Sequence, residues 1–119
     1  VRAAIMAAAE VLKPGVQGCI VDDAARNTIV AAGYPEYQHA VGHHIGRTVH
    51  DGSTLLGPRW ERYGKKPFDL VEAGNCYTLE LGVQVPGYGL VSLEEDVLVT
   101  ESGIEWLGKP QTEIIIVPV

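Results

Sequence analysis

Histidines cluster in one short stretch of the chain, the feature most suggestive of chemistry. Three of the four histidines lie within residues 41–52, and the fourth, His39, comes just before them. His43 and His50 are seven residues apart, and glycines stand on both sides of the first histidine pair. Histidine is the commonest metal ligand, and glycine lets backbone pass close to another group. The stretch therefore predicts a functional site.

Two later segments, 76–85 and 91–100, alternate between apolar and polar residues and predict a β-hairpin. Pro86-Gly87-Tyr88-Gly89 between them is typical of a turn. The polar face of this hairpin carries Glu80 and Glu94. Acidic residues are depleted in strands, so a glutamate in the middle of each arm suggests a role beyond folding.

The length of the turn decides whether these two glutamates meet. If the loop is the five residues 85–89, Gln84 pairs with Leu90 and Glu80 lies directly opposite Glu94. A four-residue loop would instead pair Glu80 with Glu95. Facing carboxylates destabilise a strand pair unless a cation lies between them. The first register therefore predicts a metal site, whereas a solvated acidic edge at residues 94–96 is the alternative.

Carboxylate oxygens together with one imidazole suit manganese, cobalt, iron or zinc. Carboxylates can also bridge two ions in a hydrolytic site that holds an activated water. For the histidines, a hydrogen-bonded polar cluster without metal is the alternative explanation. The combination of the histidine stretch with the two glutamates favours the metal site.

The elements that position these residues predict an α+β fold. The alanine-rich segment 1–13 predicts a helix that stops at Pro14-Gly15, and a second helix should begin at Asp22 or Asp23 and end at Gly33. We expect extended structure over 39–50, a binding loop or plain connection over 51–70, and a last strand over 113–117. The two helices should pack on one face of a curved, mostly antiparallel sheet.

Composition excludes several classes of protein. The 119 residues suffice for one domain or less, and 46% hydrophobic with 20% charged residues is typical of an ordinary globular domain. A net charge of −6 argues against nucleic-acid binding, and the apolar runs are too short to span a membrane. Two isolated cysteines, Cys19 and Cys76, are typical of free thiols in a cytoplasmic protein.

Taken together, these motifs resemble the pita-bread metallopeptidases, which include methionine aminopeptidases, Xaa-Pro aminopeptidases, prolidases and creatinase. The resemblance rests on four motifs in register across most of the chain: Gly42-His43-His44-Ile45-Gly46, Val49-His50-Asp51, Thr78-Leu79-Glu80, and Glu94 followed by Val97-Leu98-Val99-Thr100. It implies a peptidase with two divalent ions, manganese, cobalt, iron or zinc, in the intact enzyme. A hydroxide bridging these ions would attack the carbonyl of an N-terminal Xaa-Pro bond.

The resemblance also implies roles for individual residues. His43, Glu80 and Glu94 match metal ligands, and Glu80 also matches the residue that handles protons. His50 matches a histidine that contacts substrate and the tetrahedral intermediate, and His39 matches a substrate-binding histidine of proline-specific members. Leu81 and Ser92 depart from those members, which often carry a proline and an arginine there.

A larger departure is the missing N-terminal half of that fold, which supplies two aspartate ligands that Asp22 and Asp23 do not match. Residues 1–119 therefore correspond to a partial, C-terminal part of the catalytic domain. We expect this chain alone to hold an incomplete site with little or no catalysis, and to form a homodimer through exposed apolar surface. A non-catalytic peptide- or protein-binding module, or a creatinase-like C–N hydrolase, would fit the same fold.

Overall fold

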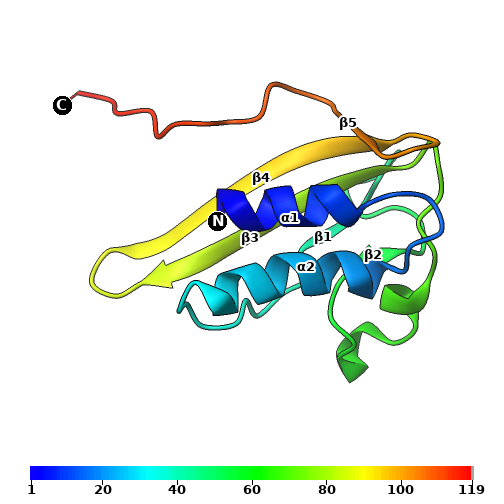
Figure 1. Cartoon of the computed structure of the whole chain (residues 1–119), viewed down its shortest axis with the longest axis horizontal. Coiled ribbons are helices and arrows are strands. Elements are labelled where there is room, and N and C mark those ends of the chain that lie inside the picture. Colours follow the sequence, from blue (N-terminus) through cyan, green and yellow to red (C-terminus); the bar gives the residue numbers. More distant parts are fainter. Residues whose placement is uncertain (119) are drawn as a thin grey trace.

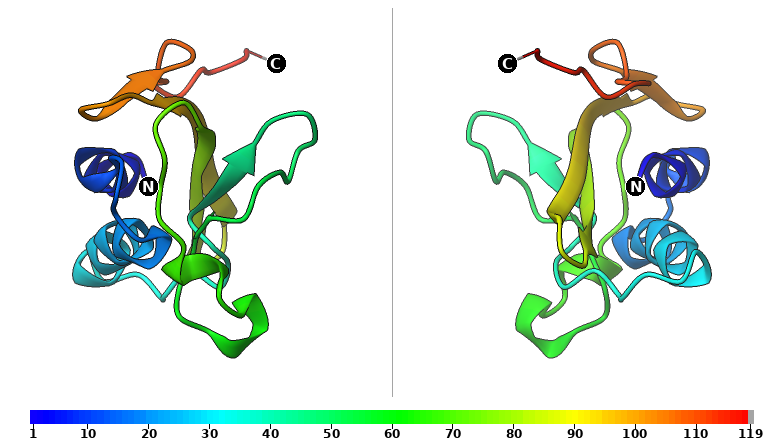
Figure 2. Two further views of the ribbon diagram at one scale, coloured as in Figure 1. Left: turned by 90° about the vertical axis from the view of Figure 1, so that its right-hand side faces the viewer. Right: turned by 90° about the vertical axis from the view of Figure 1, so that its left-hand side faces the viewer.

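Two helices cover one face of a five-stranded sheet in the computed structural model, which describes residues 1–118. The elements follow one another along the chain: α1 (Arg2–Val11), α2 (Gly18–Ala31), β1 (Gly42–Ile45), β2 (Leu55–Leu56), the 3₁₀ turns η1 (Glu61–Tyr63) and η2 (Lys66–Phe68), β3 (Cys76–Val85), β4 (Gly89–Val99) and β5 (Ile104–Trp106). The strand order is β2-β1-β3-β4-β5, with antiparallel neighbours throughout. The predicted α+β class is confirmed (Figures 1 and 2).

The core lies between the two helices and β3. Helix α1 buries Ala4, Ile5 and Ala8 at helical spacing, and α2 buries Val21, Ala25 and Ile29 in the same way. Alternate residues of β3, among them Leu79 and Leu81, close this core from the sheet side. Burying a side chain such as Ile5 stabilises the fold by roughly 1.5–3 kcal/mol, so this layer fixes how the sheet sits on the helices.

Helix α2 begins at Gly18, not at Asp22 or Asp23 as the sequence suggested. A Cβ on Gly18 would lie 2.0 Å from the Leu55 carbonyl oxygen, so only glycine fits where the helix meets β2. Asp22 does not cap the helix, because its carboxylate pairs with Arg26. The first helical turn was missed because a tertiary contact, rather than a capping side chain, sets its start.

The β3–β4 hairpin has the first of the two registers considered above. Gln84 pairs with Leu90, and Glu80 lies opposite Glu94. Val85 and Gly89 also pair, so only residues 86–88 form the tip of the turn. Gly87 has φ 81° and Gly89 φ 114°, conformations that favour glycine and explain why this turn closes with the predicted pairing.

The last strand predicted over residues 113–117 is wrong. These residues form no strand, and Ile114 to Val117 are 78–85% exposed. Strand β5 pairs with β4 only at residues 97–99, and residues 113–117 add no further strand to this edge. Instead, Gln111 ties the tail down by donating from its backbone N–H to Glu95 and accepting from Arg2. The tail then extends past the N-terminus of α1 (Figure 1).

None of the helices within residues 1–118 has the length and apolar character needed to cross a membrane.

Candidate functional site

The site begins where β1 lies against β3. The backbone N–H of His43 donates to the Thr78 hydroxyl at 3.0 Å. Gly42 permits this approach, because a Cβ there would lie 2.0 Å from the Thr78 carbonyl oxygen. This packing brings the His43 Nε2 to 3.7 Å from the Glu80 Oε1. Two of the predicted ligands, His43 and Glu80, therefore lie close together although their strands are far apart in sequence.

His50 reaches the same place from the loop that follows β1. Its ring lies 4.3 Å from the ring of His43, centroid to centroid. Asp51 holds this loop in shape, because its carboxylate accepts from the backbone N–H groups of Arg47 and Gly52 at 2.9 Å each. These two hydrogen bonds lower the pKa of Asp51 below its usual value. The loop projects from the sheet on the side away from the helices (Figure 2).

Glu80 and Glu94 face each other across β3 and β4. Burial raises the pKa of Glu80, and the neighbouring charge of Glu94 raises it further. His43 acts in the opposite direction without cancelling either effect. A cation between the two carboxylates would remove this repulsion, so the pair has the charge and the donor type that a divalent ion requires.

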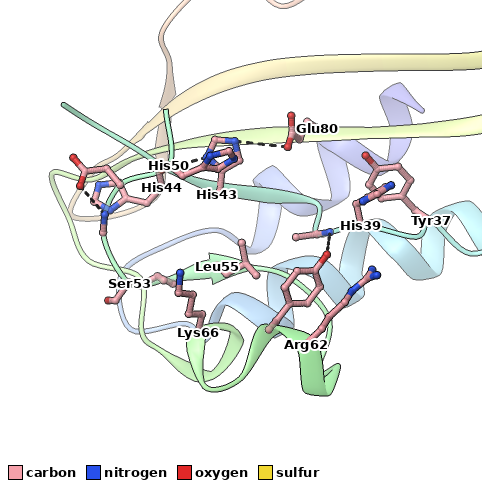
Figure 3. Close-up of a pocket in the computed structure, with 15 residues that line it drawn as sticks. Tyr37, His39, His43, His44, His50, Ser53, Leu55, Arg62, Lys66 and Glu80 are labelled. Atoms are coloured by element: carbon pink, nitrogen blue, oxygen red, sulfur yellow. Dashed lines mark hydrogen bonds and ion pairs between the residues drawn. The ribbon is translucent and has the colours of Figure 1, made fainter. Parts of the chain in front are cut away.

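A pocket of about 500 Å³ opens beside this pair of strands (Figure 3). Four predicted site residues line it: His39, His43, His50 and Glu80. The pocket continues to η1 and η2, whose side chains form the opposite wall, and this volume suits a small ligand. The structure thus brings the predicted substrate-binding and proton-handling residues to one cavity.

Glu94 opens instead into a second hollow of about 460 Å³, together with Asp96 and Thr78. His43 borders both hollows. Among residues 1–118, no three His, Cys, Asp or Glu side chains gather closely enough to hold a metal ion. The donor types fit a divalent ion, but the described residues do not close a complete shell around one.

A buried ion pair on α2 anchors the segment that leads into β1. Asp22 and Arg26 form two hydrogen bonds, of 2.6 and 2.8 Å. Arg26 also donates to the carbonyl oxygens of Tyr37 and His39, and Asp22 accepts from the Val41 N–H at 3.2 Å. We call this arrangement the Asp22–Arg26 clasp. It fixes the backbone that carries His39 and delivers β1 to β3.

Sequence reasoning missed both the clasp and the far wall of the pocket. The i, i+4 spacing of Asp22 and Arg26 is a signal for an ion pair, although not for its contacts with residues 37–41. The far wall comes from the 51–70 loop, where the sequence does not indicate that Arg62 and Lys66 line a pocket. Of the two readings of that loop, the pocket lining favours a binding loop over a plain connection.

Comparison with known proteins gives one family. The family model "Metallopeptidase family M24" matches residues 1–101. An Xaa-Pro dipeptidase of Lactobacillus helveticus is 34% identical over 99% of this chain and 30% of its own length. An Xaa-Pro dipeptidase of Pyrococcus horikoshii is 34% identical over 91% of this chain and 29% of its own length.

Comparison with solved structures also identifies peptidases. A dipeptidase PepE from Mycobacterium ulcerans matches with a TM-score of 0.84 and 32% identity, covering 99% of this chain and 30% of that one. A methionine aminopeptidase from Rickettsia prowazekii, at TM-score 0.66 and 22% identity, covers 87% of this chain and 47% of that one and shows the shared fold alone. The chain thus spans about 30% of the length of the curated relatives named above.

Proposed function

Since the chain belongs to metallopeptidase family M24, we propose that it carries part of the active site of a metal-dependent peptidase that cleaves Xaa-Pro bonds in short peptides. The relatives named Xaa-Pro dipeptidase support this substrate class. The main support in the structure is the register that sets Glu80 opposite Glu94, with His43 beside Glu80. Because the chain covers 30% of such relatives, residues outside it would complete the site.

In this proposal His43, Glu80 and Glu94 hold divalent metal. Bound ions would supply Lewis-acid chemistry, polarising the peptide carbonyl and making a water molecule more acidic. Manganese, cobalt, iron and zinc all suit this donor set.

The remaining steps fall to side chains of the pocket. Glu80 would accept the proton of the attacking water, because its carboxylate lines the pocket 3.7 Å from the His43 ring nitrogen. His50 lies beside His43, where its ring N–H would donate to the oxygen on which negative charge develops. His39 lines the same pocket and would contact the substrate.

Metal titration tests this proposal directly. Mn²⁺ or Co²⁺ is added to the chain and to the His43→Ala and Glu94→Ala variants, and binding is followed by calorimetry. Glu95→Gln is the matched control, because it removes a charge one residue away, while its side-chain oxygen can still accept from Gln111. We expect weak binding of at most one ion by the parent and the control, and none by the two ligand variants.

The other outcomes are equally informative. Tight binding of two ions would mean that a second copy of the chain supplies further carboxylates, and would restore the expected homodimer. Absence of binding, or binding that both substitutions leave untouched, would overturn the metal site and leave a peptide- or protein-binding module. With the complete site, hydrolysis of Xaa-Pro dipeptides separates a peptidase from a creatinase-like C–N hydrolase.

A further inference from the structure

His44 is the one histidine of the chain to which the site described above gives no role. It follows His43 directly in β1, so the two side chains point to opposite faces of the sheet. His44 pairs with Tyr77 of β3, and the centroids of their rings lie 5.2 Å apart at an interplanar angle of 30°. Because Tyr77 is fully buried, the His44 ring is held against the core.

Residues 46–52, which we call the His50 loop, return to this ring at their far end. A Cβ on Gly52 would lie only 1.8 Å from the Nδ1 of His44. Gly52 also has φ 65°, a conformation that favours glycine. Both the space and the backbone therefore require glycine where the loop passes the imidazole. The His44 ring thus contacts the core through Tyr77 and the loop through Gly52.

The backbone of His44 connects the same loop to the histidine ligand. Its carbonyl oxygen accepts from the Asp51 N–H at 3.0 Å and lies 3.2 Å from the His43 Nδ1. His50, the residue before Asp51, is exposed, and the Thr48 hydroxyl donates to its carbonyl oxygen at 2.9 Å. The place of the His50 ring therefore depends on how the loop is held, and His44 holds it at two points.

We propose that His44 is a positioning residue, whose ring fixes the His50 loop against Tyr77 so that the His50 ring lies beside that of His43. The proposal rests on the proposed function, in which His50 donates to the developing oxyanion. Such a donor is effective only if it is in place before the charge develops, and a misplacement of about 1 Å can cost on the order of a hundredfold in rate. His44 acts through the loop and handles no proton itself.

The test follows the loop in the metal-free chain, where chemistry plays no part. The His43 and His50 ring centroids lie 4.3 Å apart, so the parent should show a nuclear Overhauser cross-peak between their ring protons in NMR spectra. His44→Ala should lose this cross-peak, because it removes the ring that packs against Gly52. His44→Phe should restore it, because an aromatic ring again fills the space between Tyr77 and the loop.

Two controls separate positioning from a general loss of stability. Tyr77→Phe keeps the ring and removes a buried hydroxyl that has no hydrogen-bond partner within residues 1–118, so the cross-peak should persist. Ile5→Val weakens the core between the helices and the sheet without touching the loop. It should lower the midpoint of urea denaturation and leave the cross-peak intact, which a purely structural role of His44 would not distinguish from His44→Ala.

A double-variant cycle gives a second measurement that does not depend on the ring signals. Gly52→Ala should lower the urea midpoint, because its methyl group meets the His44 ring. When His44→Ala is present as well, this clash is gone, although the strained φ of residue 52 remains. The combined loss should therefore be smaller than the sum of the two single losses.

Four results would overturn the proposal: no cross-peak in the parent, a cross-peak that His44→Ala leaves intact, a loss that His44→Phe fails to repair, or additive losses in the cycle. Failure of the proposed function would be seen separately, in the metal titration of the His43 and Glu94 variants. A chain that binds no metal but keeps a His44-dependent cross-peak would retain the positioning and lose the peptidase chemistry.

Discussion

Two pairs of charged side chains lie on either side of β1 and differ in how their charges are balanced. In the Asp22–Arg26 clasp, every charge meets an opposite charge or a backbone group, and both side chains are buried. In the Glu80–Glu94 pair, two like charges face each other, and the His43 Nε2 lies 3.7 Å from the Glu80 Oε1. The charges of the clasp are balanced by groups of the chain itself, whereas the two negative charges of the glutamate pair are not.

This difference separates a structural role from a functional one. A buried charge that lacks a partner costs free energy, so the clasp is complete because the fold depends on it. Facing carboxylates also cost free energy, and a protein retains such a cost at sites that act on something else. The clasp positions the backbone of residues 37–41, which leads into β1. Strand β1 in turn places His43 beside Glu80.

The largest effect should come from breaking the clasp. Arg26→Met leaves the Asp22 carboxyl buried without its partner and removes the donors to Tyr37 and His39. We expect a loss of roughly 3–5 kcal/mol in the free energy of unfolding, measured by urea denaturation. The double variant Asp22→Asn with Arg26→Met should recover part of this loss, because it removes the buried charge. A loss below about 1 kcal/mol would show that the clasp does not organise the fold.

Removing one charge of the glutamate pair should change stability in the opposite direction. Glu94→Gln removes one of two facing charges, so the metal-free chain should gain up to about 1 kcal/mol in stability. The same variant should lose the rise in melting temperature that Mn²⁺ gives the parent. Glu95→Gln serves again as the control and should change neither quantity. A destabilised Glu94→Gln chain would mean that the carboxylates do not repel each other in the fold.

The glutamate pair was predictable because its determinants are local. The sequence limits the hairpin to two registers, and the structure has the one that pairs Glu80 with Glu94. The histidine stretch was equally visible, since His43 and His50 are seven residues apart in the sequence. Local rules therefore predicted that these residues lie close together, and the structure brings His43, His50 and Glu80 to one pocket.

The clasp, the start of α2 and the far wall of the pocket were not predictable in this way. Each depends on where a distant segment lies: residues 37–41 for Arg26, Leu55 for Gly18, and Ala40, which donates to the Tyr63 hydroxyl, for the pocket wall. The wrong last strand has the same origin, because the tail is held through Gln111 by Glu95 and Arg2, two residues distant in sequence. Tertiary context overrides local preference at these places.

Asp51 is intermediate between the two pairs: its charge is satisfied by backbone groups, as in the clasp, but its side chain is only half-buried. Its pKa is lowered in the fold by the N–H groups of Gly52 and Arg47. Its carboxylate therefore contributes stability that is fully present above the unfolded pKa and is lost as pH falls through the folded value. Asp51→Ala should remove this contribution to the acid-side decline of stability, followed by denaturation between pH 6 and 2.

In the parent chain, the backbone amide signals of Arg47 and Gly52 should titrate together with the Asp51 carboxyl in NMR spectra. Their titration at the ordinary value of a free aspartate would contradict the hydrogen bonds that shape the His50 loop.

The smallest effect should come from the ion pair that most resembles the clasp in composition. The Arg59 Nη1 lies 2.8 Å from the Oδ2 of Asp23, the residue that follows Asp22 of the clasp. The side chains of Arg59 and Asp23 are, however, 45% and 38% exposed. Water already solvates both charges, so the pair gains little by meeting. Arg59→Met should change the free energy of unfolding by less than about 1 kcal/mol, against the several expected for Arg26→Met in the same urea series. Equal losses in the two variants would mean that charge pairing, rather than burial with backbone contacts, makes the clasp strong.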